Sequence, residues 1–174
     1  MRLQTMYVET SSSGYATARA AAPQPPRSPD PTADLQCLFK SYDAASFDFD
    51  AEAVAGFYDL PCLISTQGGN ASFTARGELR AAMARLFAGY RQRGLVSASI
   101  VDLKLKTLSP DFARAVVRWS LGNARGMEVT GFSCSYTLRH ADRRWRIAHA
   151  VALDEAARLA GLTPRGPMLS LTPR

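Results

Sequence analysis

The sequence has few of the residues that mark membrane, disulfide-bonded or metal-binding proteins. None of its apolar runs approaches the roughly 18 residues that a membrane-spanning helix needs, so an integral membrane protein is not expected. The three cysteines, Cys37, Cys62 and Cys134, are scattered and odd in number, which argues against a disulfide framework and favours a reducing compartment. With only two histidines, His140 and His149, a His-rich metal cage is not expected. Because the N-terminal residues lack the apolar segment of a secretory signal, we expect a cytoplasmic protein.

Lysine is scarce, and the positive charge comes almost entirely from arginine. The 21 basic residues outnumber the 15 acidic ones to give a net charge of +6, and only Lys40, Lys104 and Lys106 are lysines. The excess is spread along the chain and forms no basic block of the kind that binds nucleic acids or anionic surfaces. We therefore expect neither a nucleic-acid partner nor a membrane partner.

Proline is almost absent from the middle of the chain. Of ten prolines, only Pro61 and Pro110 lie between residues 32 and 163. Because proline fixes φ and removes a hydrogen-bond donor, a stretch with so little of it can sustain regular helices and strands. We predict a flexible leader rich in Pro, Ser and Ala over residues 1–31, one folded domain over residues 32–152, and a short helix with a tail over residues 153–174.

Apolar residues recur at helical spacing in three segments before residue 95, which predicts three N-terminal helices. Asp48 or Asp50 can cap the second helix, and Asp59-Leu60-Pro61 is expected to break it. Gly94 fits the position that follows the third helix. The apolar stripes are Leu35, Leu38, Phe39, Tyr42 and Ala45 in the first segment, Val54, Phe57 and Tyr58 in the second, and Leu79, Met83, Leu86, Phe87 and Tyr90 in the third.

From residue 96 onward the apolar residues alternate with polar ones, which is the period of a half-buried strand. Four such segments, 96–108, 113–121, 132–138 and 144–151, are joined by short turns, so an antiparallel meander is the economical topology. Two further strands flank the turn at residues 67–70, whose glycines permit a tight hairpin. We predict an α+β domain with three N-terminal helices packed on a curved, mostly antiparallel sheet.

Several short motifs occur along this domain in an order that is typical of one known superfamily. They are Phe39 and Tyr42 on the first helix, the stretch Asp50-Ala51-Glu52-Ala53-Val54-Ala55-Gly56-Phe57-Tyr58-Asp59, the Gly77-Glu78-Leu79 start of the third helix, and the closing strands Tyr136-Thr137-Leu138-Arg139 and Trp145-Arg146-Ile147. In order and spacing they resemble the nuclear-transport-factor-2-like superfamily, also called the SnoaL-like or cystatin-like α+β cone. The similarity covers residues 33–152.

The resemblance implies a cone whose open end leads to an apolar pocket between the sheet and the helices. It also implies a homodimer formed through the outer face of the sheet. The superfamily includes isomerases, dehydratases, polyketide cyclases and transport adaptors, so the resemblance does not select an activity.

The alternation along the strands assigns candidate residues to the pocket. His149 is the candidate catalytic base, because a buried neutral imidazole can accept a proton. The alternative is that it fills the end of the sheet with its ring hydrogen-bonded to backbone, or reaches solvent beyond the core. No metal or other cofactor is expected. The candidate pocket residues are Tyr42, Tyr58, Trp119, Cys134 and Tyr136, with Cys134 expected to be an inert buried thiol.

Asp59 is the one acidic residue near the position from which steroid isomerases of this fold take their carboxylate. No Asp or Glu lies between Asp59 and Glu78, so the isomerase mechanism is not implied for this chain. We expect Asp59 to act as a turn-former.

Two functions remain open from the sequence. The first is binding of a small apolar or aromatic molecule, with cofactor-free isomerisation, dehydration or cyclisation as its chemistry. The second is a non-catalytic module that forms homodimers or binds a protein partner while its own side chains fill the cavity. A cavity of roughly 300 Å³ or more with convergent polar groups favours the first.

Overall fold

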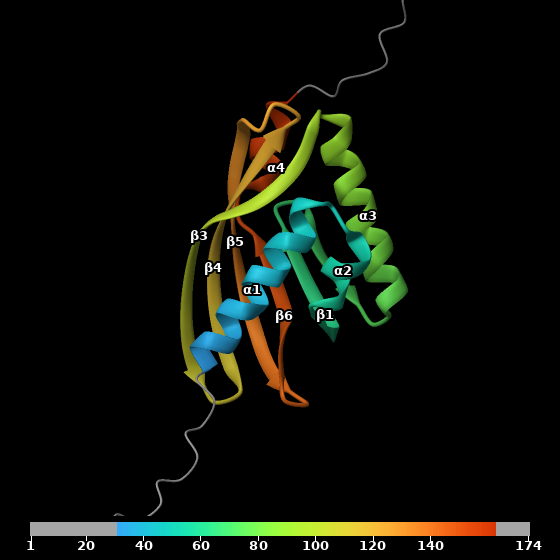
Figure 1. The fold of residues 1–174 in the computed structure, drawn as a ribbon. Helices are drawn as coiled ribbons and strands as arrows, with labels where there is room; N and C mark the ends of the chain where they lie inside the picture. Colours follow the sequence, from blue (N-terminus) through green and yellow to red (C-terminus); the bar gives the residue numbers. More distant parts are fainter. Residues whose placement is uncertain (1–30, 163–174) are drawn as a thin grey trace, which may run out of the picture.

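The structure is a computed structural model, and it describes residues 31–162. The predicted leader, apart from Pro31, and the tail after residue 162 lie outside the described residues. Figure 1 shows the elements, which in chain order are α1 (Pro31–Phe47), α2 (Ala51–Gly56), β1 (Tyr58–Thr66), β2 (Gly69–Phe73), α3 (Arg76–Gln92), β3 (Leu95–Ser109), β4 (Phe112–Asn123), β5 (Glu128–Ala141), β6 (Arg144–Ala152) and α4 (Glu155–Ala160).

The six strands form one curved sheet in the order β2-β1-β6-β5-β4-β3. Strands β3 to β6 make the predicted antiparallel meander, and β1 joins its edge parallel to β6. Helices α1, α2 and α3 lie on the concave side of the sheet, and α4 lies at the end where β6 finishes (Figure 1). The domain is therefore an α+β fold, as the sequence predicts.

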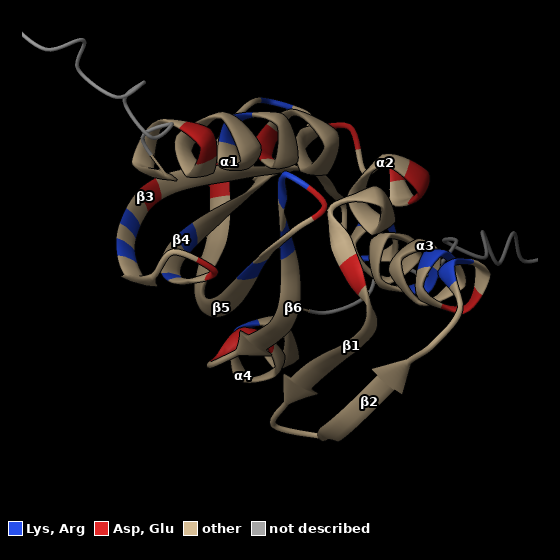
Figure 2. Cartoon of the chain, turned by 90° about the horizontal axis from the view of Figure 1, so that it is seen from below, with Lys and Arg blue, Asp and Glu red and all other residues tan. Residues whose placement is uncertain are grey.

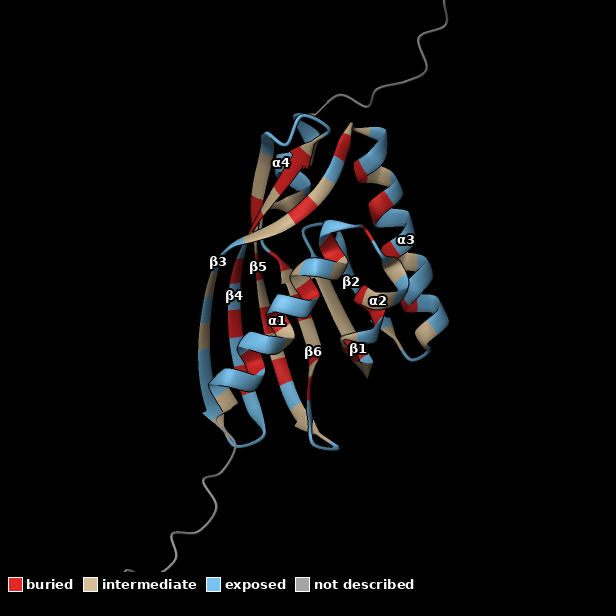
Figure 3. Ribbon diagram, in the orientation of Figure 1, coloured by how far each residue is buried: buried red, intermediate tan, exposed pale blue. Residues whose placement is uncertain are grey.

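The N-terminal helices follow the predicted apolar stripes. Figure 3 shows the outward side of α1 exposed, while its inward side is buried against the sheet. Asp50, rather than Asp48, caps α2, because its Oδ1 accepts a hydrogen bond of 3.0 Å from the Ala53 amide. Gly94 follows α3 with φ of +77°, a conformation that favours glycine. None of the helices in residues 31–162 has the length and apolar character needed to cross a bilayer.

One predicted break is a strand instead. Tyr58 and Asp59, expected at the end of the second helix, begin β1, and Leu60-Pro61 is a cis peptide within it. The sequence pattern does not reveal this change from helix to strand. Val54 in α2 and Tyr58 in β1 are both buried, and their spacing of four residues is also that of one face of a helix.

Strand β6 carries one extra, unpaired residue within the stretch that pairs with β5. Thr137 faces His149, while the next residue of β5, Leu138, faces Ile147, so Ala148 has no partner on β5. Side chains alternate between the two faces of a strand, so an extra residue reverses the faces that follow it.

This reversal overturns one prediction. Trp145 and Ile147 are buried on the concave side before the extra residue, and Ala150 and Ala152 are buried there after it. The simple alternation that placed His149 inward is therefore wrong, and His149 lies on the outer face.

Charged side chains are spread over the molecule. Figure 2 shows Lys and Arg on both helices and strands, with Asp and Glu among them. This distribution agrees with the even spread of charge along the sequence, and the absence of a nucleic-acid partner stays a prediction.

A partly buried hydrogen bond joins α1 to β3 where the register of β3 shifts. The register of β3 against β4 shifts between Ile100 and Asp102, and the Asp43 Oδ1 of α1 accepts a hydrogen bond of 2.6 Å from the Ile100 amide. We expect Asp43→Ala to lower the free energy of unfolding by about 1–3 kcal/mol, because the amide loses its acceptor. Urea denaturation followed by circular dichroism measures this. Asp48→Ala, at an exposed position just after the end of α1, is the control, and equal effects of the two substitutions would contradict the assignment.

Candidate functional site

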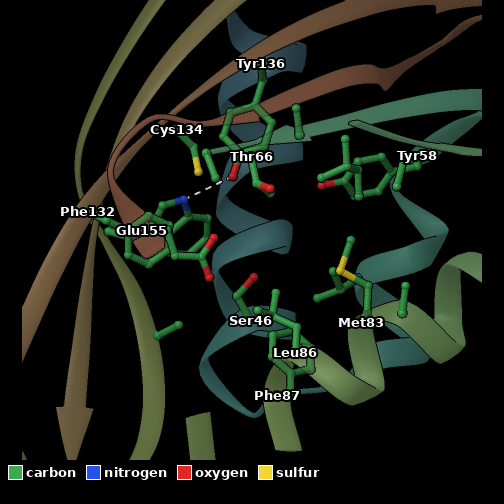
Figure 4. Close-up of a pocket in the computed structure, with 18 of the residues that line it drawn as sticks. Ser46, Tyr58, Thr66, Met83, Leu86, Phe87, Phe132, Cys134, Tyr136 and Glu155 are labelled. Atoms are coloured by element: carbon green, nitrogen blue, oxygen red, sulfur yellow. Dashed lines mark hydrogen bonds between the residues drawn. The ribbon is translucent and has the colours of Figure 1, made fainter. Parts of the chain in front are cut away.

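A cavity of about 460 Å³ lies between the concave face of the sheet and helices α1, α3 and α4 (Figure 4). Small side chains on the strands leave the space, namely Ala98 on β3 and Ala150 and Ala152 on β6. Eight aromatic side chains of residues 31–162 contribute to the wall. They are Tyr42, Tyr58, Phe73, Phe87, Tyr90, Trp119, Phe132 and Tyr136.

The cavity opens between the β1–β2 hairpin and α3. Gly68, Asn70 and Ala71 of the hairpin line it and are exposed to solvent. On the opposite side, Leu86 of α3 lines it and is 37% exposed, although its helical spacing predicts a fully buried side chain. A small molecule therefore has a route in from solvent.

The structure brings together all five predicted pocket residues. Tyr42 comes from α1, Tyr58 from β1, Trp119 from β4, and Cys134 and Tyr136 from β5, and each of them lines the cavity. The alternation along β4 and β5 holds because no extra residue interrupts their pairing over residues 112–121 of β4.

Hydroxyl groups join across the inner end of the cavity. The Tyr42 and Tyr58 hydroxyl oxygens lie 3.1 Å apart. The indole Nε1 of Trp119 donates a hydrogen bond of 3.0 Å to the Tyr136 hydroxyl, which also interacts with the hydroxyl of Tyr42. The Tyr136 hydroxyl is also a hydrogen-bond partner of the Cys134 thiol, so the three tyrosines, Trp119 and Cys134 form one connected set.

Burial keeps these groups protonated. It raises the pKa of Tyr42 to about 12, against the hydrogen bonds with Tyr58 and Tyr136, and it raises the pKa values of Tyr58 and Tyr136 well above their ordinary range. Burial likewise raises the pKa of the Cys134 thiol to about 12. The tyrosines are therefore neutral hydrogen-bond donors, and Cys134 has the character of an inert buried thiol.

His149 does not reach the cavity. Its Nε2 lies 2.9 Å from the Ser65 hydroxyl oxygen of β1, on the outer face of the sheet. The prediction that His149 faces the pocket is wrong, because the extra residue Ala148 turns the side chain away from the tyrosines.

Asp59 is not a turn-former but part of β1. Its Oδ2 accepts a hydrogen bond of 2.7 Å from Nε of Arg139 on β5, and the pair is an ion pair outside the cavity lining. Its carboxylate is committed to that arginine.

Glu155 is the functional group that the sequence reasoning missed. It begins α4, just beyond the predicted end of the domain, and its carboxylate lines the cavity. The Tyr90 hydroxyl of α3 donates a hydrogen bond to its Oε1. Burial raises the pKa of Glu155, and this hydrogen bond opposes the rise.

The hydrogen bonds of Asp154 fix the backbone just before Glu155, whose side chain lines the cavity. The Asp154 Oδ1 accepts a hydrogen bond of 2.8 Å from the Ser133 amide of β5, and its Oδ2 accepts one of 3.1 Å from Arg158. The hydrogen bond from Ser133 is the main reason that the pKa of Asp154 is lowered. The end of β6 is thus held to β5, and the first turn of α4 crosses the sheet toward α3.

The charge of the lining is simple within residues 31–162. Glu155 is its one carboxylate, and no Lys, Arg or His lines the cavity. In the same range no three His, Cys, Asp or Glu side chains gather in an arrangement that could hold a metal ion. The arrangement offers a largely apolar space lined by neutral hydroxyl donors and by a single carboxylate as proton acceptor.

The sequence matches a known protein family over most of the described residues. Residues 34–155 match the family model described as NTF2-like protein (DUF6841). The chain belongs to this NTF2-like family. The matched segment ends at Glu155, so the cavity and its carboxylate both lie within it. No curated protein matches the sequence at a significant level.

Solved structures share the cystatin-like cone with this NTF2-like protein. An NTF2-like protein of unknown function from Shewanella oneidensis aligns with a TM-score of 0.59 and 21% identity, over 72% of this chain and 100% of that one. An NTF2-like protein from Novosphingobium aromaticivorans gives 0.55 and 19%, over 70% and 80%. A ketosteroid isomerase-like protein from Erwinia carotovora atroseptica gives 0.53 and 18%, over 70% and 93%. At these identities the likeness shows the fold.

The Trp119–Tyr136 hydrogen bond is buried and open to test. Tyr136→Phe leaves the indole N–H without its acceptor, so we expect the free energy of unfolding to fall by about 1–3 kcal/mol. Urea denaturation measures it. In a protein that already carries Trp119→Phe, the same substitution should cost less, because no donor is left unpaired. Equal costs in the two backgrounds would show that the hydrogen bond contributes nothing.

Proposed function

We propose that this NTF2-like domain binds a small apolar or aromatic molecule in its cavity, with cofactor-free isomerisation, dehydration or cyclisation as the chemistry. The observation that carries the proposal is the cavity of about 460 Å³, which is large enough for a ligand of several rings. Chemistry of this class needs proton donors and acceptors that converge on one space, and the hydroxyls and the carboxylate described above meet that need. The name of the ketosteroid isomerase-like neighbour agrees with this class.

The size of the cavity argues against the rival function. A module with a plugged interior would have Trp119 and Tyr136 filling the space. Both instead hold their polar atoms against each other at the wall, and the space beside them stays open (Figure 4).

Filling the cavity tests the proposal. The uncharged dye N-phenyl-1-naphthylamine brightens in apolar surroundings, and we expect it to bind the wild-type protein in a saturable way. Replacing Ala150 and Ala152 by Leu adds side-chain volume to the cavity wall, so dye affinity should fall about tenfold or more while the fold is kept. Fluorescence titration measures the affinity, and circular dichroism checks the fold.

His149→Ala is the matched control on the same strand. Because this side chain lies on the outer face, dye affinity should be unchanged. Saturable binding that survives the two leucines, or no saturable binding at all, would contradict the proposal.

We further propose a homodimer formed through the outer face of the sheet. Across β4, β5, β6 and β1 this face carries a row of small uncharged side chains, Val116, Ser135, Val151 and Ser65. Val116 is 36% exposed, and Arg114 donates a hydrogen bond to the Ser135 hydroxyl in this row. Small side chains allow a second copy to approach closely and symmetrically. The free cysteines in residues 31–162 support the cytoplasm as its compartment.

Sedimentation velocity tests the dimer. The wild-type protein should sediment as a dimer and Val116→Asp as a monomer, because a carboxylate in the middle of the face would be buried beside its own copy. Leu108→Asp, at the far end of β3, should leave the dimer intact. A monomeric wild-type protein would refute this proposal.

A further inference from the structure

The lining of the cavity is unusual in its charge. Aromatic and aliphatic side chains surround one carboxylate, and among residues 31–162 no basic side chain lines the cavity to neutralise it. A carboxylate in such surroundings is poorly solvated, which makes it a stronger base than the same group in water.

The geometry leaves half of this carboxylate open. Tyr90 donates to Oε1, and no described residue makes a hydrogen bond to Oε2. Oε2 is also absent from the buried polar atoms that lack a partner, so it can be reached by a small molecule. Figure 4 shows the Glu155 carboxylate and the Ser46 hydroxyl directed into the same part of the cavity.

We propose that Glu155 is the general base of the cavity and that the substrate is an uncharged carbonyl compound with an acidic C–H bond. Tyr90 is its positioning residue, which holds the carboxylate toward the cavity. The inference rests on the proposed function and deepens it.

The charge of the site selects this substrate class. An anionic substrate would meet the carboxylate with no cation to offset the repulsion, whereas an uncharged, largely apolar one meets walls that match it. In the proton transfer, Oε2 takes the proton from the carbon beside the carbonyl, and the electron pair of the broken C–H bond forms an enolate. The proton returns from the carboxylic acid to the substrate, so no oxidant or reductant is needed.

The ketone 2-tetralone is a probe for this chemistry. In deuterium oxide, Glu155 should remove a C1 proton, exchange it with solvent through the open mouth, and return a deuteron to the same carbon. Proton NMR follows the loss of the C1 signal. We expect exchange faster than in buffer, and Glu155→Gln should lower the protein-catalysed rate by about 100-fold or more.

Glu52→Gln is the matched control. This glutamate is exposed and paired with Arg80 at 3.1 Å, away from the cavity lining, so its replacement should leave the exchange rate unchanged. Circular dichroism verifies that each variant is folded.

The pH dependence of the exchange rate tests whether Tyr90 positions Glu155 or only supports the fold. The titratable groups that interact with Glu155 from neighbouring elements are Tyr90 on α3, Cys134 on β5 and Tyr42 on α1, and burial keeps all three protonated near neutral pH. The Tyr90 hydrogen bond lowers the pKa of Glu155. Exchange needs the ionised carboxylate, so its rate should rise as pH passes the pKa of Glu155. Tyr90→Phe should move that rise to higher pH, which a purely structural role would not do.

The outcomes distinguish this inference from the proposed function. If the naphthylamine dye binds and 2-tetralone displaces it, but exchange equals that of the Glu155→Gln protein, Glu155 is not the base although the cavity binds ligands. If 2-tetralone fails to displace a bound dye, the assignment of an uncharged carbonyl compound is wrong. If the dye itself does not bind, the proposed function fails first. Should Glu155→Gln not fold, the pH shift in Tyr90→Phe decides, and an unmoved profile overturns the proposal.

Discussion

The cavity depends on one unpaired residue in β6. Ala148 reverses the faces of the strand, so that Ala150 and Ala152, rather than His149, face the helices. Two methyl groups then stand where an imidazole and a larger aliphatic side chain would otherwise fill the space. Trp145 and Ile147, on the other side of the bulge, stay buried in the core. The same strand therefore packs a solid core at one end and leaves a hollow at the other.

The polar groups in this hollow have separate roles. The Trp119 indole and the three tyrosine hydroxyls form a connected set at the inner end, which keeps buried donors and acceptors paired. Glu155 reaches the cavity from a different element, α4, whose start is held to β5 by the Asp154 hydrogen bond. The hydroxyl donors and the carboxylate line one cavity, so a bound molecule can meet both. This arrangement, rather than any single residue, makes proton transfer a reasonable chemistry for the site.

The regular parts of this arrangement could be predicted from the sequence. The strands of the meander and the stripes of α1 and α3 follow from the spacing of apolar residues, and the same alternation identified Trp119, Cys134 and Tyr136 as pocket residues. His149 could not be placed, because a bulge at an alanine changes neither composition nor apolar spacing in a recognisable way. Glu155 was missed because the domain was taken to end at residue 152. One signal in the sequence could have found it. Glu155 is an acidic residue at the start of the short helix that is predicted directly after the last strand.

Xenon under pressure in a crystal of the protein is the most direct test of the account. Xenon enters apolar cavities that are empty of side chains and reports its position without a knowledge of the natural ligand. The account predicts electron density for xenon beside Trp119, Ala150 and Leu86, and His149 on the outer face against Ser65. A crystal structure in which side chains fill this space, or in which β6 runs without the extra residue and His149 points among the tyrosines, would contradict it.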